Sequence, residues 1–285
     1  METSTHTNCL LCDHSSLKVL RGYEKDHLVR CRKCSFVFSS RIPSVEELVT
    51  FYDGYQRANA ISPITIKRYH ELLDQFEEFR STGNIIDIGC GDGYFLEVAK
   101  ERGWNVFGVE FTDEALEVCS AKGITMLRGP LEAANYEPDF FDVVTSFEVI
   151  EHIYNPRKEV SDIRTILRKD GLFYVTTPNF NSISRSVLGH KWTILNYPEH
   201  LSYYTRKTMN RFMKTMRFTK LRTETTGIGI QRFRTAVTGE EKSQEALREK
   251  TETRALYRLA KKTINGLLRF TASGDAMKGY FINSK

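Results

Sequence analysis

Four cysteines near the start of the chain have the spacing of a metal site. Cys9 and Cys12 form one Cys-x-x-Cys pair, Cys31 and Cys34 form a second, and 18 residues separate the two pairs. Each Cys-x-x-Cys turn offers two thiolates to one tetrahedral ion, so two turns complete a four-thiolate zinc site. The spacing therefore predicts a structural zinc ribbon with a hairpin between the pairs. Disulfide bonds are the alternative.

A glycine-rich turn farther along the chain suits the binding of a nucleotide. Gly89, Gly91 and Gly93 follow a short apolar run and allow a sharp turn and a close approach of the backbone to a ligand. Glu110 ends the next apolar run, 21 residues after Gly89, where an acid can accept both hydroxyls of a ribose. Asp87 places a carboxylate where a dinucleotide would place phosphate, so we expect a ligand with a positive centre.

Acidic residues and histidines form a third group. Glu148, Glu151 and His152 follow another apolar run, and His200 lies in the long segment 178–204. A carboxylate and an imidazole three to four residues after Glu148 can turn one face toward a cleft. A histidine in such a place can act as a general base, and carboxylates with histidines can hold a metal ion.

Apolar runs and amphipathic segments alternate along the chain, which predicts parallel strands joined by helices. The predicted strands are 85–88, one that ends at 110, 124–127, 140–147, 171–177, 218–225 and 277–283, and the predicted helices are 44–52, 61–80, 112–122, 156–168 and 205–216. This order predicts an α/β fold with a doubly wound sheet and a ligand at the carboxyl ends of its strands.

The stretch from Asp87 to Gly93, together with Glu110, resembles motif I and the ribose-binding acid of class I S-adenosylmethionine-dependent methyltransferases. The resemblance implies an enzyme with a mostly parallel seven-stranded sheet whose last strand is antiparallel. It implies S-adenosylmethionine as the cofactor and a small molecule as the methyl acceptor. The cofactor residues that it implies are Asp87, Gly89, Gly91, Gly93, Glu110, Phe111, Leu131, Phe147 and Glu148.

The segment from Phe141 to His152 resembles that of ubiquinone-type O-methyltransferases. In small-RNA 2′-O-methyltransferases, a similar Glu-x-x-Glu-His run with a later histidine binds a divalent metal, and Glu148, Glu151, His152 and His200 match that composition. A second divalent metal is therefore one hypothesis. The other is that Glu151 and His152 only orient the next loop.

Segment 178–204 is too long for a plain strand connection and is expected to overhang the cofactor pocket. Its Glu199-His200-Leu201-Ser202-Tyr203 run resembles zinc-ribbon-bearing sugar C-methyltransferases. The resemblance implies a sugar or a polysaccharide or natural-product precursor as acceptor, with His200 as general base, Glu199 or a tyrosine orienting it, and His152 beside the methyl donor. The alternatives are a metal-assisted O-methyltransferase acting on a quinone-like phenol or a ribose hydroxyl, and a non-enzymatic zinc-ribbon scaffold.

Composition and charge indicate where the protein is expected to act and what it is expected to bind. No run of about 18 apolar residues is present and the N-terminus lacks an apolar signal core, so a cytoplasmic protein is expected. The net charge is +5, and residues 231–285 hold twelve Lys and Arg against six Asp and Glu, which places the excess in the tail and argues against nucleic-acid binding. A basic amphipathic helix over 241–269 is expected to pack against the protein or a second subunit rather than a membrane.

These patterns divide the chain into four parts. Residues 1–41 form the zinc ribbon, 42–82 a helical linker and cap in which Tyr55 could line the pocket, 83–235 the cofactor-binding core with the excursion 178–204, and 236–285 the amphipathic helix and the final strand. The oligomeric state does not follow from the sequence.

Overall fold

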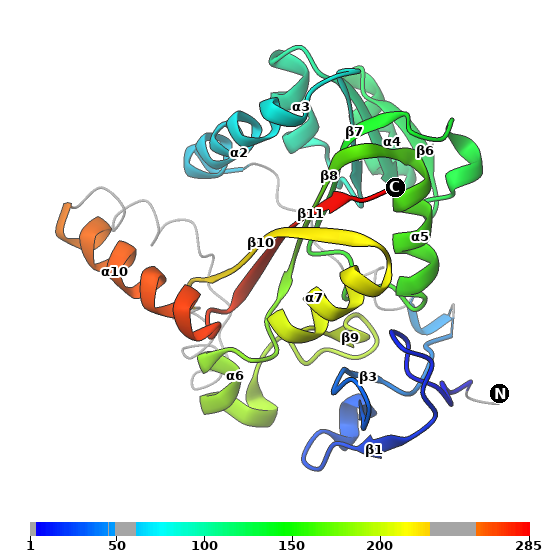
Figure 1. Ribbon diagram of the computed structural model, residues 1–285, viewed down its shortest axis with the longest axis vertical. Coiled ribbons are helices and arrows are strands. Elements are labelled where there is room, and N and C mark those ends of the chain that lie inside the picture. Colours follow the sequence, from blue (N-terminus) through cyan, green and yellow to red (C-terminus); the bar gives the residue numbers. More distant parts are fainter. Residues whose placement is uncertain (1–3, 45, 49–60, 229–254) are drawn as a thin grey trace.

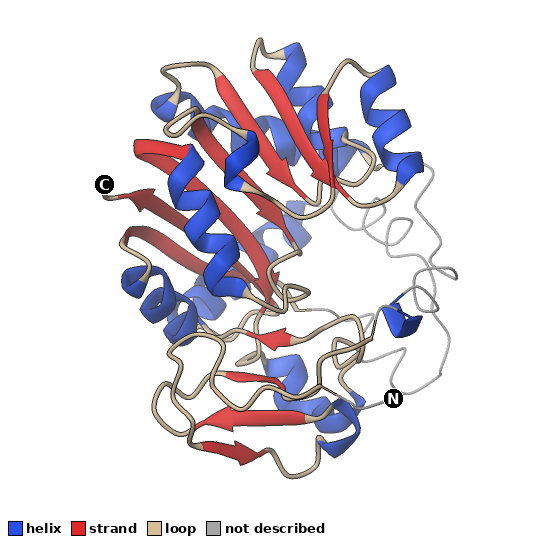
Figure 2. Ribbon diagram, turned by 90° about the vertical axis from the view of Figure 1, so that its right-hand side faces the viewer, coloured by secondary structure: helices blue, strands red, loops and turns tan. Residues whose placement is uncertain are grey.

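Two β-sheets form the scaffold of the residues that the computed structural model describes, 4–44, 46–48, 61–228 and 255–285. A seven-stranded sheet runs through the larger part of the molecule and a four-stranded sheet through the smaller part (Figure 1). The arrowheads of the parallel strands point toward the smaller sheet (Figure 2). The smaller sheet therefore lies beyond the edge at which a doubly wound sheet binds its ligand.

The large sheet has the strand order β10-β11-β8-β7-β4-β5-β6. Its strands are β4 (Asn84–Ile88), β5 (Asn105–Glu110), β6 (Thr125–Arg128), β7 (Phe141–Phe147), β8 (Leu167–Pro178), β10 (Phe218–Thr226) and β11 (Ala276–Asn283). The five strands from β4 to β8 pair in parallel, and β11 runs antiparallel between β8 and β10. The predicted mostly parallel, seven-stranded sheet is confirmed.

Helices cover both faces of this sheet. The described α-helices of the chain are α2 (Pro63–Phe76), α3 (Tyr94–Glu101), α4 (Asp113–Ala121), α5 (Pro156–Ile166), α6 (Ile183–Leu188), α7 (Arg206–Thr215) and α10 (Ala255–Thr271), and short 3₁₀ turns lie at Glu24–Asp26, Glu77–Phe79, Ala133–Asn135 and Gly189–Lys191. The predicted helix 61–80 ends as an α-helix at Phe76 and continues as a 3₁₀ turn. The helix predicted to reach residue 168 ends at Ile166, because β8 begins at Leu167.

Successive strand residues point to opposite faces, so the sheet separates two hydrophobic cores. On one face, α2 and α3 pack on alternate residues such as Ile85 and Val143. On the other face, α5 and α7 pack on the intervening residues such as Ile86 and Val144. Side chains buried in this way contribute about 1.5–3 kcal/mol each. This burial fixes the carboxyl ends of β4, β5 and β7 relative to one another.

The small sheet is built from two distant parts of the chain. Its strands are β1 (Leu17–Val19), β2 (Leu28–Cys31), β3 (Val37–Ser39) and β9 (Ser202–Tyr203), in that order. The β1–β2 hairpin between the cysteine pairs is as predicted. The prediction placed residues 202 and 203 in the core excursion, but they pair with β3 and complete the ribbon sheet. The ribbon and the excursion thus share one sheet. The predicted division into consecutive segments of the chain assigned them to different parts.

The contact between the ribbon and the core is also aromatic. The ring of Phe36 lies 5.0 Å from the ring of Tyr204, and both side chains are buried. Phe36 thus seats the ribbon on the larger part of the molecule.

Near the C-terminus, α10 precedes the final strand. Leu268 is buried, whereas Ile264, Leu267 and Phe270 are exposed, Phe270 at 85%. The predicted helix 241–269 lies in part outside the described residues, as do most of the predicted helix 44–52 and Tyr55. None of the described helices is both long and apolar enough to span a membrane.

Candidate cofactor and acceptor site

The glycine turn leaves β4 at the edge of the sheet, where two of its glycines have different tasks. Gly89 has a φ of +66°, and a Cβ there would lie 2.6 Å from Cγ2 of Val149. Gly91 has a φ of +54°, but a Cβ there would meet no atom of the described residues within 4 Å. Gly89 is therefore required by the packing of the protein itself. Gly91 borders open space that a ligand can enter.

Glu110, at the end of β5, holds the turn in place. Its Oε2 accepts a hydrogen bond from the backbone N–H of Gly91 at 3.0 Å, and its Oε1 accepts one from the N–H of Phe111 at 2.7 Å. Each carboxylate oxygen has a second lone pair, so Glu110 can also accept ribose hydroxyls. The neighbouring ring of Phe111 is 59% exposed, and Gly93 forms the N-cap of α3.

Two residues predicted at the cofactor lie beneath its site. Asp87 is buried, and its carboxylate accepts a hydrogen bond of 2.7 Å from the hydroxyl of Thr145. Burial raises the pKa of Asp87 to about 7, and the nearby charge of Glu110 adds to the rise. Leu131 is 1% exposed and belongs to the core, so it supports the site from below. A direct contact of either side chain with the cofactor stays a prediction.

Aromatic rings form one wall beside the turn. The ring of Phe147 lies 5.0 Å from that of Phe95 and 6.2 Å from that of Tyr69, on α2. Glu148 follows Phe147 with a φ of +54°, a conformation that costs energy for a residue with a side chain. Its N–H bonds to Oγ1 of Thr176 at 3.1 Å, which fixes this conformation. Such strain is found most often at functional sites.

The loop after β7 and the excursion bring Glu151, His152 and His200 together. Each can offer one ligand atom, and these atoms lie within 4.8 Å of one another. The loop also contacts the cofactor turn, because Val149 packs against Gly89. Three of the four residues proposed for a metal from the sequence therefore meet beside the cofactor turn. Glu148 is not part of this group.

The two histidines have the same hydrogen-bonding pattern. Nδ1 of His152 lies 3.0 Å from the carbonyl oxygen of Glu199, and Nδ1 of His200 lies 2.6 Å from that of Ile194. A carbonyl only accepts, so in the neutral form of each ring the proton is on Nδ1 and the lone pair is on Nε2. Burial lowers the pKa of His152 to about 4, and His200 adds to this, which keeps His152 neutral.

The sequence assigned the orientation of His200 to Glu199 or a tyrosine, and the structure corrects this. The carboxylate of Glu199 accepts a hydrogen bond from Asn196 instead, and Tyr203 bonds to the backbone carbonyl of His200. A backbone carbonyl, that of Ile194, holds the ring of His200.

Glu151 is the unusual member of the group. It is 2% exposed, and neither of its carboxylate oxygens has a hydrogen-bond partner among the described residues. Burial raises its pKa well above the ordinary value, and the charge of Glu148 adds to the rise. A buried carboxylate without a partner is costly, so a bound group that satisfies it would be favoured.

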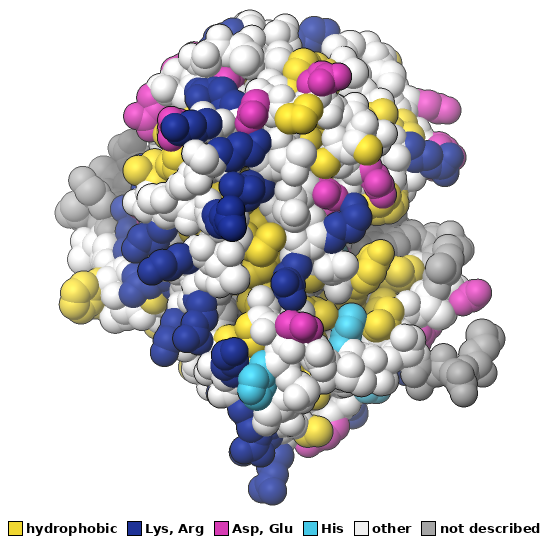
Figure 3. All heavy atoms as spheres, turned by 45° about the vertical axis from the view of Figure 1, so that its right-hand side comes forward, with side chains coloured by type: hydrophobic (Ala, Val, Ile, Leu, Met, Phe, Trp, Pro, Cys, Tyr) yellow, Lys and Arg dark blue, Asp and Glu magenta, His cyan; other side chains and the backbone are white. Residues whose placement is uncertain are grey.

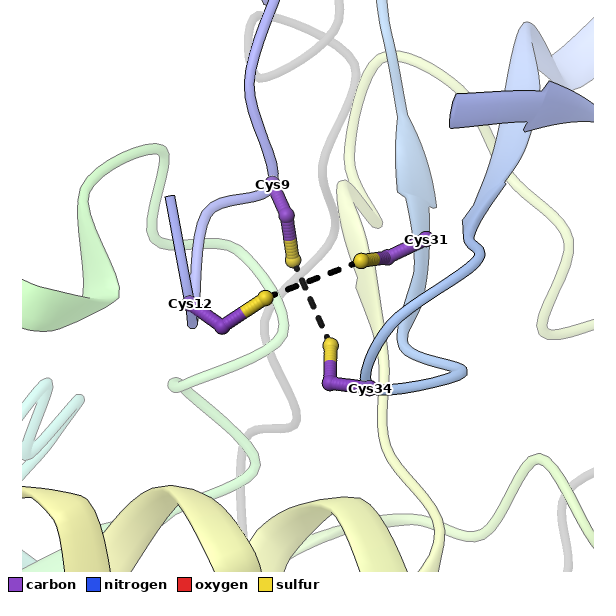
Figure 4. A group of neighbouring side chains, drawn as sticks. All are labelled: Cys9, Cys12, Cys31 and Cys34. Atoms are coloured by element: carbon purple, nitrogen blue, oxygen red, sulfur yellow. Dashed lines mark hydrogen bonds between the residues drawn. The ribbon is translucent and has the colours of Figure 1, made fainter. Parts of the chain in front are cut away.

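The four N-terminal cysteines converge on one point (Figure 4). Sγ of Cys9 lies 3.5 Å from that of Cys34, and Sγ of Cys12 lies 3.6 Å from that of Cys31. Sulfurs bonded to one tetrahedral zinc at 2.3 Å would be about 3.8 Å apart. The hydrogen bond from Cys9 lowers the pKa of Cys34 to about 5. The sulfurs therefore fit a zinc ion, and all four thiols are free of disulfides.

Residues 56–222 match the family model described as "Methyltransferase domain", and they make up more than half of the chain. The chain belongs to this family. Together with the cofactor turn and the seven-stranded sheet, this makes it a class I S-adenosylmethionine-dependent methyltransferase. The scaffold without enzymatic activity is thereby dropped as an alternative.

Curated relatives of this methyltransferase include two ubiquinone biosynthesis O-methyltransferases. The one from Nitrosomonas europaea is 25% identical over 161 residues, which cover 53% of this chain and 67% of that protein. The one from Paraburkholderia phymatum is 31% identical over 131 residues, which cover 43% of this chain and 56% of that protein. The chain therefore spans about half to two thirds of the length of these relatives.

A solved structure of an S-adenosylmethionine-dependent methyltransferase from Archaeoglobus fulgidus has the same fold. The two structures align with a TM-score of 0.55 at 16% sequence identity. The alignment covers 82% of this chain and 99% of the Archaeoglobus fulgidus chain.

Sequence reasoning missed three features of this methyltransferase. Thr145 and Tyr69, beneath and beside the cofactor turn, carry no motif of their own. Lys278 has a signal in the sequence, because it is the one charged residue in strand 276–283. Basic charge is also not confined to the tail, since residues 206–222 hold seven Lys and Arg and no Asp or Glu. Figure 3 shows Lys and Arg side chains gathered in a band on one face.

Proposed function

We propose that this methyltransferase transfers the methyl group to a hydroxyl oxygen of a small molecule, and that His200 takes up the hydroxyl proton. The observation that supports this is the pair of imidazoles, His152 and His200, whose Nδ1 atoms face backbone carbonyls and whose Nε2 atoms are left to accept a proton beside the cofactor turn. A hydroxyl oxygen becomes a strong nucleophile only as it loses its proton. A neutral histidine is suited to accept that proton.

The bonds and charges balance in this step. Bound S-adenosylmethionine supplies a methyl group on a positively charged sulfur. The acceptor oxygen forms the new bond to carbon while the carbon–sulfur bond breaks, and its electron pair stays on sulfur, which becomes a neutral thioether. The proton of the hydroxyl passes to Nε2 of His200. The protein's contribution is to hold the reacting atoms in line and to provide the base.

A metal-assisted form of the same reaction is the second candidate, and Glu151 favours it. A buried carboxylate without a hydrogen-bond partner, next to two imidazole lone pairs, is a donor set that suits a divalent ion. Glu151, His152 and His200 would hold the ion, which would supply a Lewis acid that lowers the pKa of the acceptor hydroxyl. The backbone carbonyls of Glu199 and Ile194 would fix the imidazoles as outer-shell partners.

The acceptor class is part of the proposal. The relatives named for ubiquinone biosynthesis are O-methyltransferases, which supports a phenolic hydroxyl. The sugar acceptor stays a prediction from sequence resemblance, and neither these relatives nor the geometry of the cluster adds support to it.

We also propose that Cys9, Cys12, Cys31 and Cys34 bind one structural zinc. Four sulfurs complete its coordination, so no position is left for a substrate. The ribbon shares its sheet with β9, next to His200, so the zinc would stabilise the segment that carries the proposed base.

Product analysis tests the methyl transfer. The protein is incubated with S-adenosylmethionine and either catechol or UDP-glucose, and formation of S-adenosylhomocysteine and of an O-methylated product is measured by mass spectrometry. We expect methylated catechol, and a loss of turnover of about 10²-fold in His200→Asn. His190→Asn is the matched control, because His190 is an exposed histidine of the same excursion. Equal turnover in both variants would reassign proton abstraction to another residue.

A further inference from the structure

Lys278 lies in a row of residues that crosses the sheet at the acceptor edge. In the register of the sheet it is opposite Thr176 of β8, and Thr176 is opposite Phe147 of β7. In the neighbouring row, Ser146 of β7 is opposite Ile88, the residue before the cofactor turn. Figure 1 shows β11 beside β8 and β10. Lys278, Thr176 and Phe147 thus form one row that reaches the end of β7, next to the row that leads to the cofactor turn.

The side chain of Lys278 is on the same face as the aromatic wall. Residues directly opposite each other on neighbouring strands point to one face of a sheet, so Lys278, Thr176 and Phe147 share a face. Phe147 packs there against Tyr69 of α2. Strands are spaced about 4.8 Å apart, which puts the Cα of Lys278 about 10 Å from the end of β7. A lysine side chain can bridge much of that distance.

Lys278 is half-buried, and its ammonium group has no counter-ion among the described residues. No described carboxylate lies within 4.0 Å of it, although its neighbour across the strands is Glu224. Glu224 pairs with Arg269 at 3.5 Å instead. A partly buried ammonium group without an anion is costly, and an incoming anion would remove that cost.

The surrounding charges add to this preference. Burial lowers the pKa of Lys278, and the positive charge of Arg68 on α2 lowers it further, while Glu224 opposes the effect. Arg269 also lowers this pKa, and Glu148 raises it slightly. An anionic ligand beside Lys278 would be attracted by the charge of its ammonium group and by those of Arg68 and Arg269.

We propose that Lys278 binds an anionic group, a carboxylate or a phosphate, on the methyl acceptor and thereby selects which acceptors are methylated. The inference rests on the proposed methyl transfer to a hydroxyl, which it deepens by naming a charge on the acceptor. The Glu151, His152 and His200 cluster lies at the end of β7, and Lys278 lies two strands away. An acceptor whose hydroxyl is at the cluster side can reach Lys278 with an acidic group at its other end.

Binding to the product-loaded protein tests the inference without requiring turnover. Calorimetry compares 3,4-dihydroxybenzoate with catechol, which lacks the carboxylate, on protein saturated with S-adenosylhomocysteine. We expect the wild type to bind the carboxylate compound about tenfold more tightly, the worth of one charged hydrogen bond. Lys278→Met should remove this preference, and Lys278→Arg should keep it. Lys220→Met is the matched control, an exposed lysine of the adjacent strand at the opposite end of the sheet.

The cofactor also carries a carboxylate, so its affinity is measured in a separate arm. Loss of S-adenosylhomocysteine affinity in Lys278→Met, with acceptor discrimination unchanged, would mean that Lys278 serves the cofactor and would overturn the inference. Equal binding of both compounds by the wild type would overturn it as well.

Methyl transfer to the two compounds separates this inference from the proposed function. If both compounds are methylated with equal kcat/KM by the wild type and by Lys278→Met, hydroxyl methylation stands and the role of Lys278 fails. If the carboxylate compound binds with Lys278-dependent affinity but neither compound is methylated, the role of Lys278 stands and the proposed transfer to a phenolic hydroxyl fails. A rise in KM confined to the carboxylate compound in Lys278→Met supports both.

Discussion

The rings of His152 and His200 lie 4.8 Å apart, and each has its Nδ1 against a backbone carbonyl. The two carbonyls belong to one short segment of the excursion, at Ile194 and Glu199. The excursion therefore fixes the tautomer of both rings, although the two histidines come from loops that follow different strands. A site of this kind can serve as a base or as a metal ligand. A substitution of Glu151 can distinguish the two uses, because its carboxylate is the third possible ligand of an ion.

Metal content distinguishes the two forms of the reaction. If the cluster holds a divalent ion, the native protein should contain one equivalent beyond the zinc, and Glu151→Gln should lose it because a neutral amide is a poorer ligand. Plasma emission spectrometry of both proteins gives the stoichiometry. Glu159→Gln is the control, since Glu159 is another buried acid, with its pKa raised to about 7 by burial, but outside the cluster. An unchanged metal content in Glu151→Gln would leave His200 as a metal-free base.

The ribbon should contain one zinc ion per chain. Cys31→Ser removes one thiolate from four, so zinc stoichiometry should fall toward zero and the midpoint of thermal unfolding should drop, because metal binding is coupled to folding. Cys90→Ser is the matched control, because Cys90 is a free cysteine outside the ribbon. A ribbon that keeps its zinc after the Cys31 substitution would contradict a four-thiolate site.

Local patterns predicted the parts of the fold that depend on neighbouring residues. The strand before Gly89, the turn, and Glu110 at the end of β5 belong to one βαβ unit, and residue spacing alone locates them. The cysteine ribbon was predictable for the same reason, because each Cys-x-x-Cys turn is local. The alternation of strands and helices then implied the parallel sheet.

Features that depend on distant pairing could not be predicted in the same way. β9 is two residues long and pairs with β3, more than 160 positions earlier, so neither its existence nor its partner has a local signal. The backbone carbonyls that hold the histidines also leave no signature in side-chain types. Lys278 is meaningful only because β11 lies next to β8, which places it in one row with Thr176 and with Phe147 at the end of β7.

Substitution at Gly91 should remove cofactor binding more than it harms the fold. A side chain at Gly91 enters space that is open in the protein, so Gly91→Val should weaken binding of S-adenosylhomocysteine by at least about tenfold, the effect of losing about 1.4 kcal/mol. Calorimetry measures this affinity. Gly22→Val is the control, because Gly22 also has a positive φ and open surroundings but lies in the ribbon. The two variants should lose similar thermal stability, and equal cofactor affinity would disprove the assignment.

Glu110 should have two separable effects. Glu110→Gln keeps one carbonyl acceptor for the N–H of Gly91 or of Phe111, whereas Glu110→Ala removes both. We expect both variants to bind S-adenosylhomocysteine more weakly, and Glu110→Ala also to lose protection of the turn in hydrogen exchange. Binding at the wild-type level in both would show that another residue accepts the ribose hydroxyls.

Asp87 makes the stability of the cofactor-free protein depend on pH. Its pKa is raised to about 7 in the folded state, mainly by burial, while an exposed aspartate has a pKa of 3.8. A group whose pKa is raised on folding contributes its stability fully below the unfolded value and loses it as the pH rises through the folded value. The relevant window is therefore pH 4 to 7.

Asp87→Asn cannot ionise and retains an acceptor for the hydroxyl of Thr145. The free energy of unfolding of the wild type, relative to Asp87→Asn, should fall by up to about 4 kcal/mol across this window. Urea unfolding at each half unit of pH measures this free-energy difference. The contributions of other buried acids, such as Glu159, are the same in both proteins and cancel. A constant difference between the two proteins would show that Asp87 is ionised in the folded protein throughout this range.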